Sequence, residues 1–275
     1  MDLSTIEFDI SKDIDLRHIF ECGQCFRWNA SEDGGYVGVA SGHACRATYD
    51  GGKLELDVSG GDRDFWYDYF DLGTDYSVIK SRLVTDDDRI ADAVESGSGI
   101  RILDQDFFEV LISFIISQNN NIPRIKKCIE GLAGRFGETA GFFAGKERYA
   151  FPTPERLACV TEDELAPLKL GYRAGYIARA AKQYMTEGMP EGTADEKMKQ
   201  LLSYYGIGPK VANCILLFGS REFGAFPIDV WMRKVMHDVY GFEESDLKGM
   251  QAFAAEKFGG LGGYAQQYLF YYCRG

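Results

Sequence analysis

The stretch LLSYYGIGPKVANCILLFGSREFGAFPIDV, residues 201–230, decides the fold of the second part of this chain. A helical pattern ends at the turn Gly206-Ile207-Gly208-Pro209, and a second, mostly apolar helix follows. Glycine lets backbone amides approach a ligand closely, and proline begins a helix without wasting a donor. The pattern therefore predicts a helix–hairpin–helix. The free amides at its turn and the dipole of its second helix together favour the binding of one DNA phosphate. The turn alone leaves open an ordinary corner between two helices.

Two charged residues flank the second helix of this motif. Lys210 lies in its first turn, and Asp229 follows 19 residues later, after the nearly apolar run 211–218. Partial desolvation and a nearby helix start both favour a neutral amine, which can attack a sugar carbon and form a Schiff base. A carboxylate nearby stabilises the positive charge that develops on the sugar. The alternatives are a solvated charge for Lys210 and a helix N-cap for Asp229.

The composition is that of a globular protein. Of the 275 residues, 45% are hydrophobic and 26% are charged, which excludes a mostly disordered or fibrous chain. The longest apolar stretch, residues 110–116, is far shorter than the ~20 residues of a membrane span. The start, MDLSTIEFDISKD, has no basic region followed by an apolar block, so we expect no signal peptide. We therefore expect an intracellular protein, cytoplasmic (nucleoid) in a prokaryote and nuclear in a eukaryote.

The net charge of −12 is unevenly distributed along the chain. Residues 1–102 hold 21 acids and 10 bases, whereas residues 103–275 hold 21 acids and 20 bases. Nucleic-acid binders usually carry a basic surface, so the acidity argues against a broad attractive field. The second part can still bind a phosphate backbone through a few placed contacts.

The seven cysteines predict neither a disulfide framework nor a metal site. Their number is odd, they are scattered, and no secretory signal precedes them. Cys22 and Cys25 form a single C-x-x-C, for which zinc would need two more ligands from His18, His43 and Cys45. An iron–sulfur cluster would need four closely spaced cysteines near the carboxyl terminus, where only one lies.

Hydrophobic periodicity divides the chain into two parts. Short β-forming runs separated by glycine-bearing turns occupy residues 36–40, 45–49 and 54–58. Helices are expected at 76–84, 87–95, 107–116, from 123, from 153, from 161, from 173, at 193–205, 209–218, 229–240 and 264–272. We predict an α+β protein, in which an antiparallel β-sheet domain at 1–102 precedes an all-α, helix–hairpin–helix domain at 103–275.

These motifs resemble those of a known family. Gly-x-Gly-x-Lys with an aspartate about nineteen residues on is the signature of helix–hairpin–helix DNA glycosylases. Among them the chain resembles the 8-oxoguanine DNA glycosylases of the eukaryotic type. Five segments carry the resemblance: GQCFRW (23–28), SQNNNIPRI (117–125), LGYRAGY (170–176), GIGPKVANC (206–214) with PIDV (227–230), and YAQQYLF (264–270). Related iron–sulfur glycosylases share the lysine and aspartate. They also need a cluster of four cysteines near the carboxyl terminus, where this sequence has only Cys273.

The resemblance implies a bifunctional base-excision repair enzyme. Lys210 would be the nucleophile at C1′ and would support β-elimination of the 3′ phosphate, with Asp229 as its electrostatic and acid–base partner. Gly206 and Gly208 would hold a DNA phosphate at the hairpin. No cofactor is required, and the resemblance admits a monovalent or calcium ion at the hairpin. The implied partner of this monomeric enzyme is double-stranded DNA containing 8-oxoguanine opposite cytosine, with no membrane involved.

The resemblance also assigns a pocket for the extruded base. Cys214 would pack on one face of the base and Phe270 on the other. 8-Oxoguanine has a hydrogen on N7 where guanine has a lone pair, so the carbonyl of Gly23 would accept from the first and repel the second. Gln266 would read the Watson–Crick edge, because an amide both donates and accepts.

A third group would hold the cytosine left unpaired. Asn119, Arg124 and Arg173 match these positions, and their planar groups suit paired hydrogen bonds to base edges. Tyr172 matches the wedge that enters the strand beside the cytosine. Taken singly, the asparagine would be part of a helix-ending loop and the arginines solvated charges.

Some positions depart from the family pattern. Asn213 stands where an acidic residue is usual, Trp231 where a histidine contacts phosphate, and Tyr204-Tyr205 where Leu-Pro precedes the hairpin. Two other functions stay open: a glycosylase of the same superfamily for alkylated or other oxidised bases, and a non-catalytic DNA-binding module of the same fold. The presence of both the lysine and the aspartate disfavours the module.

Overall fold

Alternation of apolar and polar side chains builds the amino-terminal sheet. In β5 (Lys53–Val58), Leu54, Leu56 and Val58 are buried, and the residues between them are half-exposed. The computed structural model, which describes residues 3–274, places five antiparallel strands in the order β1-β5-β4-β3-β2. The other four strands are β1 (Ser4–Asp9), β2 (Asn29–Ala30), β3 (Tyr36–Ala40) and β4 (His43–Tyr49).

Helices make up most of the rest of the chain. Those before residue 103 are α1 (Leu16–Glu21), α2 (Arg63–Tyr69), α3 (Tyr76–Asp86) and α4 (Ala91–Ser96). Those after it are α5 (Phe107–Ser117), α6 (Ile122–Phe136), α7 (Pro154–Ala158), α8 (Glu162–Leu165), α9 (Arg173–Glu187), α10 (Ala194–Ser203), α11 (Pro209–Gly219), α12 (Val230–Tyr240), α13 (Leu247–Phe258) and α14 (Gly262–Tyr272). The predicted α+β class, with a sheet followed by a helical part, is confirmed.

Several elements were not foreseen from the sequence; besides β1, β2, α1 and α2, they are a second hairpin and α13. A hairpin of β6 (Thr139–Phe143) and β7 (Lys146–Tyr149) follows α6 and covers β4. Its strands are short and interrupted by an irregularity at Gly141, so the period-2 pattern is weak. Helix α13 buries only Met250, Ala254 and Phe258, a stripe too narrow to mark a helix in the sequence.

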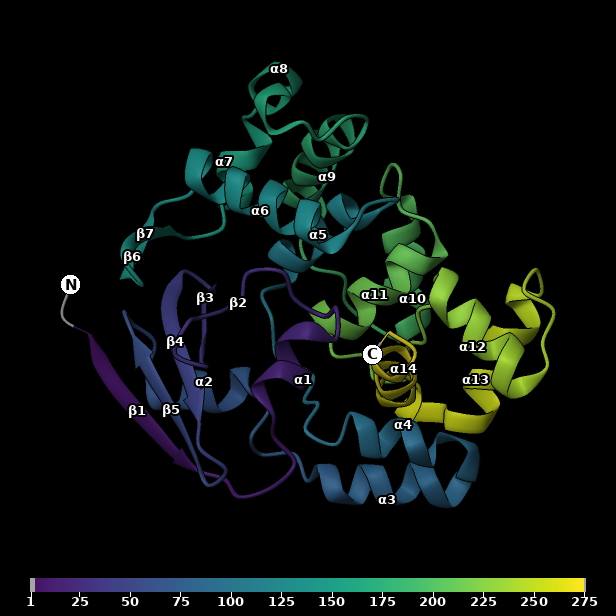
Figure 1. The fold of residues 1–275 in the computed structure, drawn as a ribbon. Coiled ribbons are helices and arrows are strands. Elements are labelled where there is room, and N and C mark those ends of the chain that lie inside the picture. Colours follow the sequence, from purple (N-terminus) through teal and green to yellow (C-terminus); the bar gives the residue numbers. More distant parts are fainter. Residues whose placement is uncertain (1–2, 275) are drawn as a thin grey trace.

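The two parts of the chain pack into one helical core. Figure 1 shows the sheet on one side, α5–α9 above it, and α10–α14 opposite, with α3 and α4 beneath α14. Helix α4 contacts α14, and Tyr76 and Leu83 of α3 are buried in the same core as Tyr268. Because α14 also contacts α12 and α13, it packs against elements of both parts of the chain. None of the helices in the described part of the chain has the length and apolar character needed to cross a bilayer.

Candidate active site

The hairpin before α11 is shaped by its glycines. Gly206 has a φ of +86°, and a side-chain carbon there would lie 2.4 Å from the ring of Tyr176 on α9. Gly208 is the N-cap of α11, has open space beside its α-carbon, and is followed by Pro209 in the first turn. The first amides of this 11-residue helix have no partner within the helix, as an anion site requires.

Lys210 lies in the first turn of α11, between two cavities. Its side chain is half-buried, and its ammonium group lies 5.8 Å from the ring centre of Phe114 on α5. On one side is a groove of about 1110 Å³ lined by α10–α13, and on the other a small cavity of about 40 Å³. The amine therefore lies beside buried helices rather than in bulk solvent.

Asp229 is both a helix cap and a wall of the small cavity. Its Oδ1 accepts a hydrogen bond of 2.8 Å from the amide of Met232 and so caps α12. A carboxylate has two oxygens, so capping leaves Oδ2 available to the cavity. In the described part of the chain, Asp229 and Lys210 form no ion pair with each other, although both line this cavity.

The small cavity brings together six residues singled out from the sequence. These are Gly23, Lys210, Cys214, Asp229, Gln266 and Phe270. Five further residues line it: Cys22, Phe114, Phe218, Pro227 and Gln267. Most of the second group lies in apolar stretches that give no sign of a cavity. Gln267 follows Gln266 in the chain, but the sequence did not show that both side chains line the same cavity.

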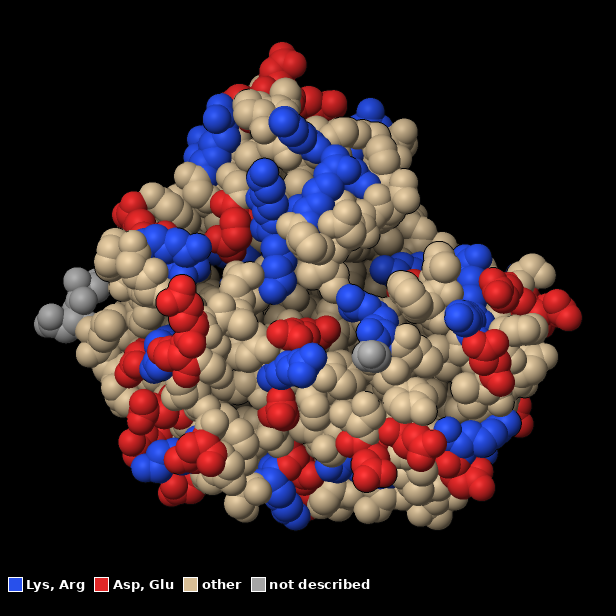
Figure 2. Space-filling view, viewed as in Figure 1, with Lys and Arg blue, Asp and Glu red and all other residues tan. Residues whose placement is uncertain are grey.

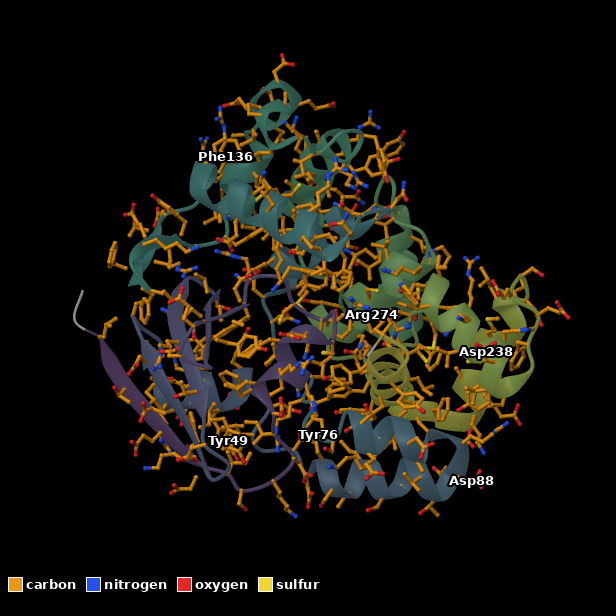
Figure 3. The ribbon with its side chains drawn as sticks, viewed as in Figure 1. Tyr49, Tyr76, Asp88, Phe136, Asp238 and Arg274 are labelled. Atoms are coloured by element: carbon orange, nitrogen blue, oxygen red, sulfur yellow. The ribbon has the colours of Figure 1, made fainter. Side chains whose placement is uncertain are left out.

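Gly23 and Phe270 make a contact that a larger residue would disturb. Gly23 has a φ of +81°, in the left-handed region, and a side-chain carbon there would lie 3.1 Å from the Phe270 ring. The Arg274 guanidinium lies 5.1 Å from the ring centre of Phe270. Figure 3 shows Arg274 at the end of α14, in the middle of the face in view. Gly23 and Phe270 also line a second pocket of about 340 Å³, so they separate the two spaces.

Cys214 and Gln266, two of the polar side chains that line the small cavity, are almost fully buried. Burial raises the pKa of the Cys214 thiol, while Lys210 opposes and Asp229 reinforces this shift. The thiol is therefore neutral near pH 7 and offers a polarisable, nearly apolar surface. Gln266 is 4% exposed, and its Oε1 accepts a hydrogen bond of 2.8 Å from Nε2 of Gln267.

Gln24 fixes the segment that carries Gly23. It is 1% exposed, and its Nε2 donates to the carbonyl oxygens of Ile19 and Arg101. Its Oε1 accepts from the amide of Leu103 at 2.9 Å. All three partners are backbone groups, so the buried amide fixes the segment that carries Gly23 against residues 101–103.

Arg27 joins the same segment to the helices. It is 3% exposed, its Nε donates to Glu130 of α6 at 2.6 Å, and its Nη1 lies 3.9 Å from Glu109 of α5. Burial raises the pKa of Glu109 to about 7; Arg27 opposes this shift, and Asp106 and Glu130 add to it. The junction between sheet and helices therefore contains a carboxyl group that titrates near neutral pH.

The residues expected around the opposite base lie near one another on the surface. Asn119 follows α5, is exposed and has a φ of +46°. Arg124 on α6 is exposed, and its Nη2 donates to the carbonyl of Lys169 at 3.0 Å. Tyr172, just before α9, is 51% exposed, and its hydroxyl lies 3.4 Å from the carbonyl oxygen of Gln118.

Arg173 has a different environment from Arg124. It is 4% exposed and makes four hydrogen bonds to the carbonyl oxygens of Gln118, Asn119 and Leu170. A guanidinium has five N–H groups, so one is left. Arg173 thus holds the loop that carries Asn119, and its guanidinium lies 4.6 Å from the ring centre of Tyr172.

The positions that depart from the family pattern lie around the hairpin. Asn213 is 7% exposed, donates to the carbonyl of Pro209 at 2.9 Å and lines the large groove rather than the small cavity. Trp231 is 50% exposed in the first turn of α12. Tyr204 is buried, whereas Tyr205 is 56% exposed beside the hairpin.

Charge is segregated on the surface around these elements. Figure 2 shows Lys and Arg side chains over α6 and α9, whereas acidic side chains lie mainly over the sheet and α3. A hollow near the centre of this face adjoins Arg274, and Arg17, Lys126 and Glu21 also line the pocket of about 340 Å³ there. Basic side chains therefore border the upper part of the hollow, while acidic side chains lie mainly over the lower part of this face.

Two family models match the chain. One, described as the N-terminal domain of 8-oxoguanine DNA glycosylase, matches residues 7–111. The other, described as HhH-GPD superfamily base excision DNA repair protein, matches residues 112–259. Together they span most of the sheet and most of the helices described above.

Similar proteins include one curated relative and two solved structures. A probable N-glycosylase/DNA lyase of Methanothermobacter thermautotrophicus is 33% identical over 230 residues, which are 74% of this chain and 72% of that protein. The Clostridium acetobutylicum 8-oxoguanine glycosylase/lyase, solved with double-stranded DNA containing cytosine opposite 8-oxoG, is 39% identical with a TM-score of 0.90 and covers 96% of this chain and 92% of its own. MBOgg1, solved with a low-affinity DNA ligand, is 40% identical with a TM-score of 0.93 and covers 100% and 99%.

Proposed function

Because this chain belongs to the HhH-GPD superfamily of base excision DNA repair proteins and carries the amino-terminal domain of 8-oxoguanine DNA glycosylases, we propose that it excises 8-oxoguanine from double-stranded DNA and then cleaves the abasic site. The family inferred from the sequence is confirmed by these matches. One observation carries the reaction: Lys210 and Asp229 line the same cavity. A nucleophile and its carboxylate partner must meet at the same sugar carbon.

Lys210 is the proposed nucleophile. Its amine forms a bond to C1′ while the bond from C1′ to N9 of the base breaks, and Asp229 passes the proton that the amine loses to the departing base. Opening of the sugar ring then gives a Schiff base, and loss of a proton from C2′ expels the 3′ phosphate by β-elimination. Asp229 accepts the proton of the amine and stabilises the positive charge on the sugar.

The extruded base must enlarge the cavity to enter it. About 40 Å³ is roughly the volume of one water molecule, far less than a purine needs. Phe270 is the residue proposed to move, because it is half-buried and separates this cavity from the larger pocket. The base then lies between Cys214 and Phe270, with its N7–H donating to the carbonyl of Gly23 and its Watson–Crick edge facing Gln266.

The DNA outside the pocket is held in two places. A phosphate binds the free amides at Gly206 and Gly208. Asn119 and Arg124 hydrogen-bond the unpaired cytosine, Tyr172 fills the space left in the duplex, and Arg173 adds its remaining N–H while it holds the loop. Cytosine opposite the lesion is proposed for this chain because the C. acetobutylicum enzyme was solved with that pair.

The two parts of the chain divide this work. We assign residues 1–102 to an amino-terminal domain that supplies the carbonyl of Gly23, and residues 103–275 to the helix–hairpin–helix domain that supplies the other site residues. A DNA repair enzyme acts inside the cell, and we place this one at the nucleoid of a prokaryote or in the nucleus of a eukaryote.

Borohydride trapping on an 8-oxoguanine:cytosine duplex tests the proposal. We expect a covalent complex with the wild type, because borohydride reduces the Schiff base to a stable amine. A parallel panel of duplexes with alkylated bases and oxidised pyrimidines identifies the preferred lesion. Excision of those bases in preference to 8-oxoguanine would assign the enzyme to another branch of the superfamily, and binding without excision or trapping would make the chain a DNA-binding module.

A further inference from the structure

Two adjacent glutamines of α14 line the cavity proposed for the base. Gln266 is 4% exposed and Gln267 is 2% exposed. The Nε2 of Gln267 donates to the Oε1 of Gln266, as described above. The Oε1 of Gln267 is buried and has no hydrogen-bond partner among the described residues. Gln267, one of the residues that line this cavity, therefore carries an acceptor without a partner, beside the amide already assigned to the base.

An unpartnered acceptor at this position destabilises the folded protein. Its carbonyl has lost its water and gained no donor in return. A methionine would fill nearly the same volume on this helix without that cost. Polar groups kept buried and unpaired in this way are expected where a ligand supplies the missing partner.

The hydrogen bond between the glutamines also sets the direction of both amides. Oε1 of Gln266 already accepts one hydrogen bond from Gln267, so the unpaired groups of Gln266 are a second lone pair and its Nε2 donor. The group of Gln267 with no partner among the described residues is its Oε1 acceptor. In this arrangement the donor of Gln266 and the acceptor of Gln267 remain for a ligand, and the hydrogen bond between the two amides makes their orientations depend on each other.

From this arrangement we infer that Gln267 is a specificity-determining residue, whose Oε1 accepts a hydrogen bond from the Watson–Crick edge of a guanine-type base. The inference rests on the proposed function and extends it. Guanine presents an O6 acceptor beside N1–H and 2-amino donors, which matches the donor of Gln266 and the acceptor of Gln267. Adenine presents a 6-amino donor beside an N1 acceptor and therefore mismatches both.

The second glutamine answers a question that Gly23 leaves open. 8-Oxoguanine and 8-oxoadenine both carry a hydrogen on N7, so a carbonyl at Gly23 accepts from either base. Discrimination between the two oxidised purines must therefore come from the Watson–Crick edge. A single amide can rotate by half a turn to suit either edge, whereas two amides joined by a buried hydrogen bond keep that bond only if both rotate together.

Single-turnover excision of 8-oxoguanine and 8-oxoadenine, each opposite cytosine, tests this role. For Gln267→Met we expect the ratio of the two rates to fall about tenfold, the loss expected for one buried hydrogen bond. The melting temperature should stay the same or rise, because the unpaired acceptor is gone. Gln267→Ala must lower the ratio in the same direction, and it serves in place of the methionine variant if that protein does not fold. Gln251→Met on α13, outside the small cavity, is the matched control and should leave the ratio unchanged.

The outcomes separate this inference from the proposed function. A folded Gln267→Met protein with an unchanged ratio, or with both rates lowered by the same factor, overturns the inference, because a merely structural residue would affect both bases equally. A wild type that releases neither base overturns the proposed function itself. The wild-type excision rates are therefore measured before any variant is compared.

Discussion

The small cavity and the two loops around the proposed opposite-base site are built in contrasting ways. The cavity is formed by residues of packed helices, and Cys214 and Gln266 are each 4% exposed. The opposite-base residues lie on or beside two loops, and φ is positive at exposed Asn119 in the first and at Lys169 and Gly171 in the second. The polar side chains of this group bond to protein carbonyls, as Arg124 of α6 does to Lys169. Apart from Phe270, the walls of the cavity are thus held in place before DNA arrives, whereas the proposed opposite-base group must exchange or rearrange its contacts on binding.

The largest effect is expected at the nucleophile. Lys210→Gln should give no borohydride-trapped complex and should slow excision by at least about 10³-fold. Because the side chain is half-buried, the fold should survive, and circular dichroism checks this. Lys53→Gln, on the exposed sheet at β5, removes the same charge and should be trapped like the wild type. Trapping of Lys210→Gln at the wild-type level would assign the nucleophile to another residue.

A smaller loss is expected at Asp229, where two roles coincide. Asparagine is as good an N-cap as aspartate, so Asp229→Asn keeps the cap of α12 but removes the charge. Base release should slow by roughly 10²–10³-fold while DNA binding and the melting temperature change little. Single-turnover excision and a thermal melt measure the two roles separately. Full activity in this variant would leave only the capping role.

Gly23 tests whether the cavity tolerates a change of shape. Gly23→Ala places a carbon 3.1 Å from the Phe270 ring at a φ of +81°. We expect a loss of about 1–2 kcal/mol in stability and a roughly tenfold lower preference for 8-oxoguanine over guanine. Gly34→Ala is the matched control, because Gly34 has a φ of +84° but nothing within 4 Å. Gly34→Ala should lose similar stability but keep the preference for 8-oxoguanine over guanine. If Gly23→Ala keeps the same preference as Gly34→Ala, Gly23 has no role in lesion recognition.

The two arginines of the proposed opposite-base site sharpen the comparison. Arg124→Gln should relax the preference for cytosine by about tenfold with no change in stability, because Arg124 is exposed. Arg173→Gln breaks up to four buried hydrogen bonds and should cost about 2–4 kcal/mol of stability. Excision against all four opposing bases, together with urea unfolding, measures both. Unchanged rates against all four bases for Arg124→Gln would refute its role.

The smallest effect concerns the junction behind Gly23. The folded pKa of Glu109 is raised from 4.5 to about 7, so its protonated form favours the folded state. That stability is present below about pH 4.5 and is lost as the pH rises through about 7. Between pH 5 and pH 8 the wild type should lose on the order of 2 kcal/mol more than Glu109→Gln, which cannot titrate. Parallel losses in urea titrations of both proteins would contradict this.

Much of the fold followed from local patterns. The β-runs and glycine turns before residue 60 predicted the sheet, and the helix pair around Gly206 predicted the hairpin before α11. The β6–β7 hairpin and α13 were missed, because short strands and narrow apolar stripes leave little periodic signal. Asp229 shows a second limit of sequence-based prediction, since the sequence does not distinguish an aspartate that caps a helix from one that lines a cavity.

The candidate site was predictable as a set of residues but not as a space. Lys210, Cys214 and Gln266 were named from motifs, and their roles in the reaction stay predictions. Phe114 and Phe218 line the same cavity although they lie in apolar runs, which only predict burial. The four bonds of Arg173 to nearby carbonyls were likewise unforeseen, because an arginine in a sequence does not state its partners.

The amino-acid order by itself determined the class of elements, the hairpin and the family, because turns, caps and apolar spacing act between neighbours along the chain. Only the tertiary structure decided that the segment after α1, helices α5, α11 and α14, and the start of α12 enclose one cavity. It also decided that Gln267 orients Gln266 and keeps a free acceptor. Both depend on how distant helices pack and how far each side chain is buried, and burial is a property of the whole fold.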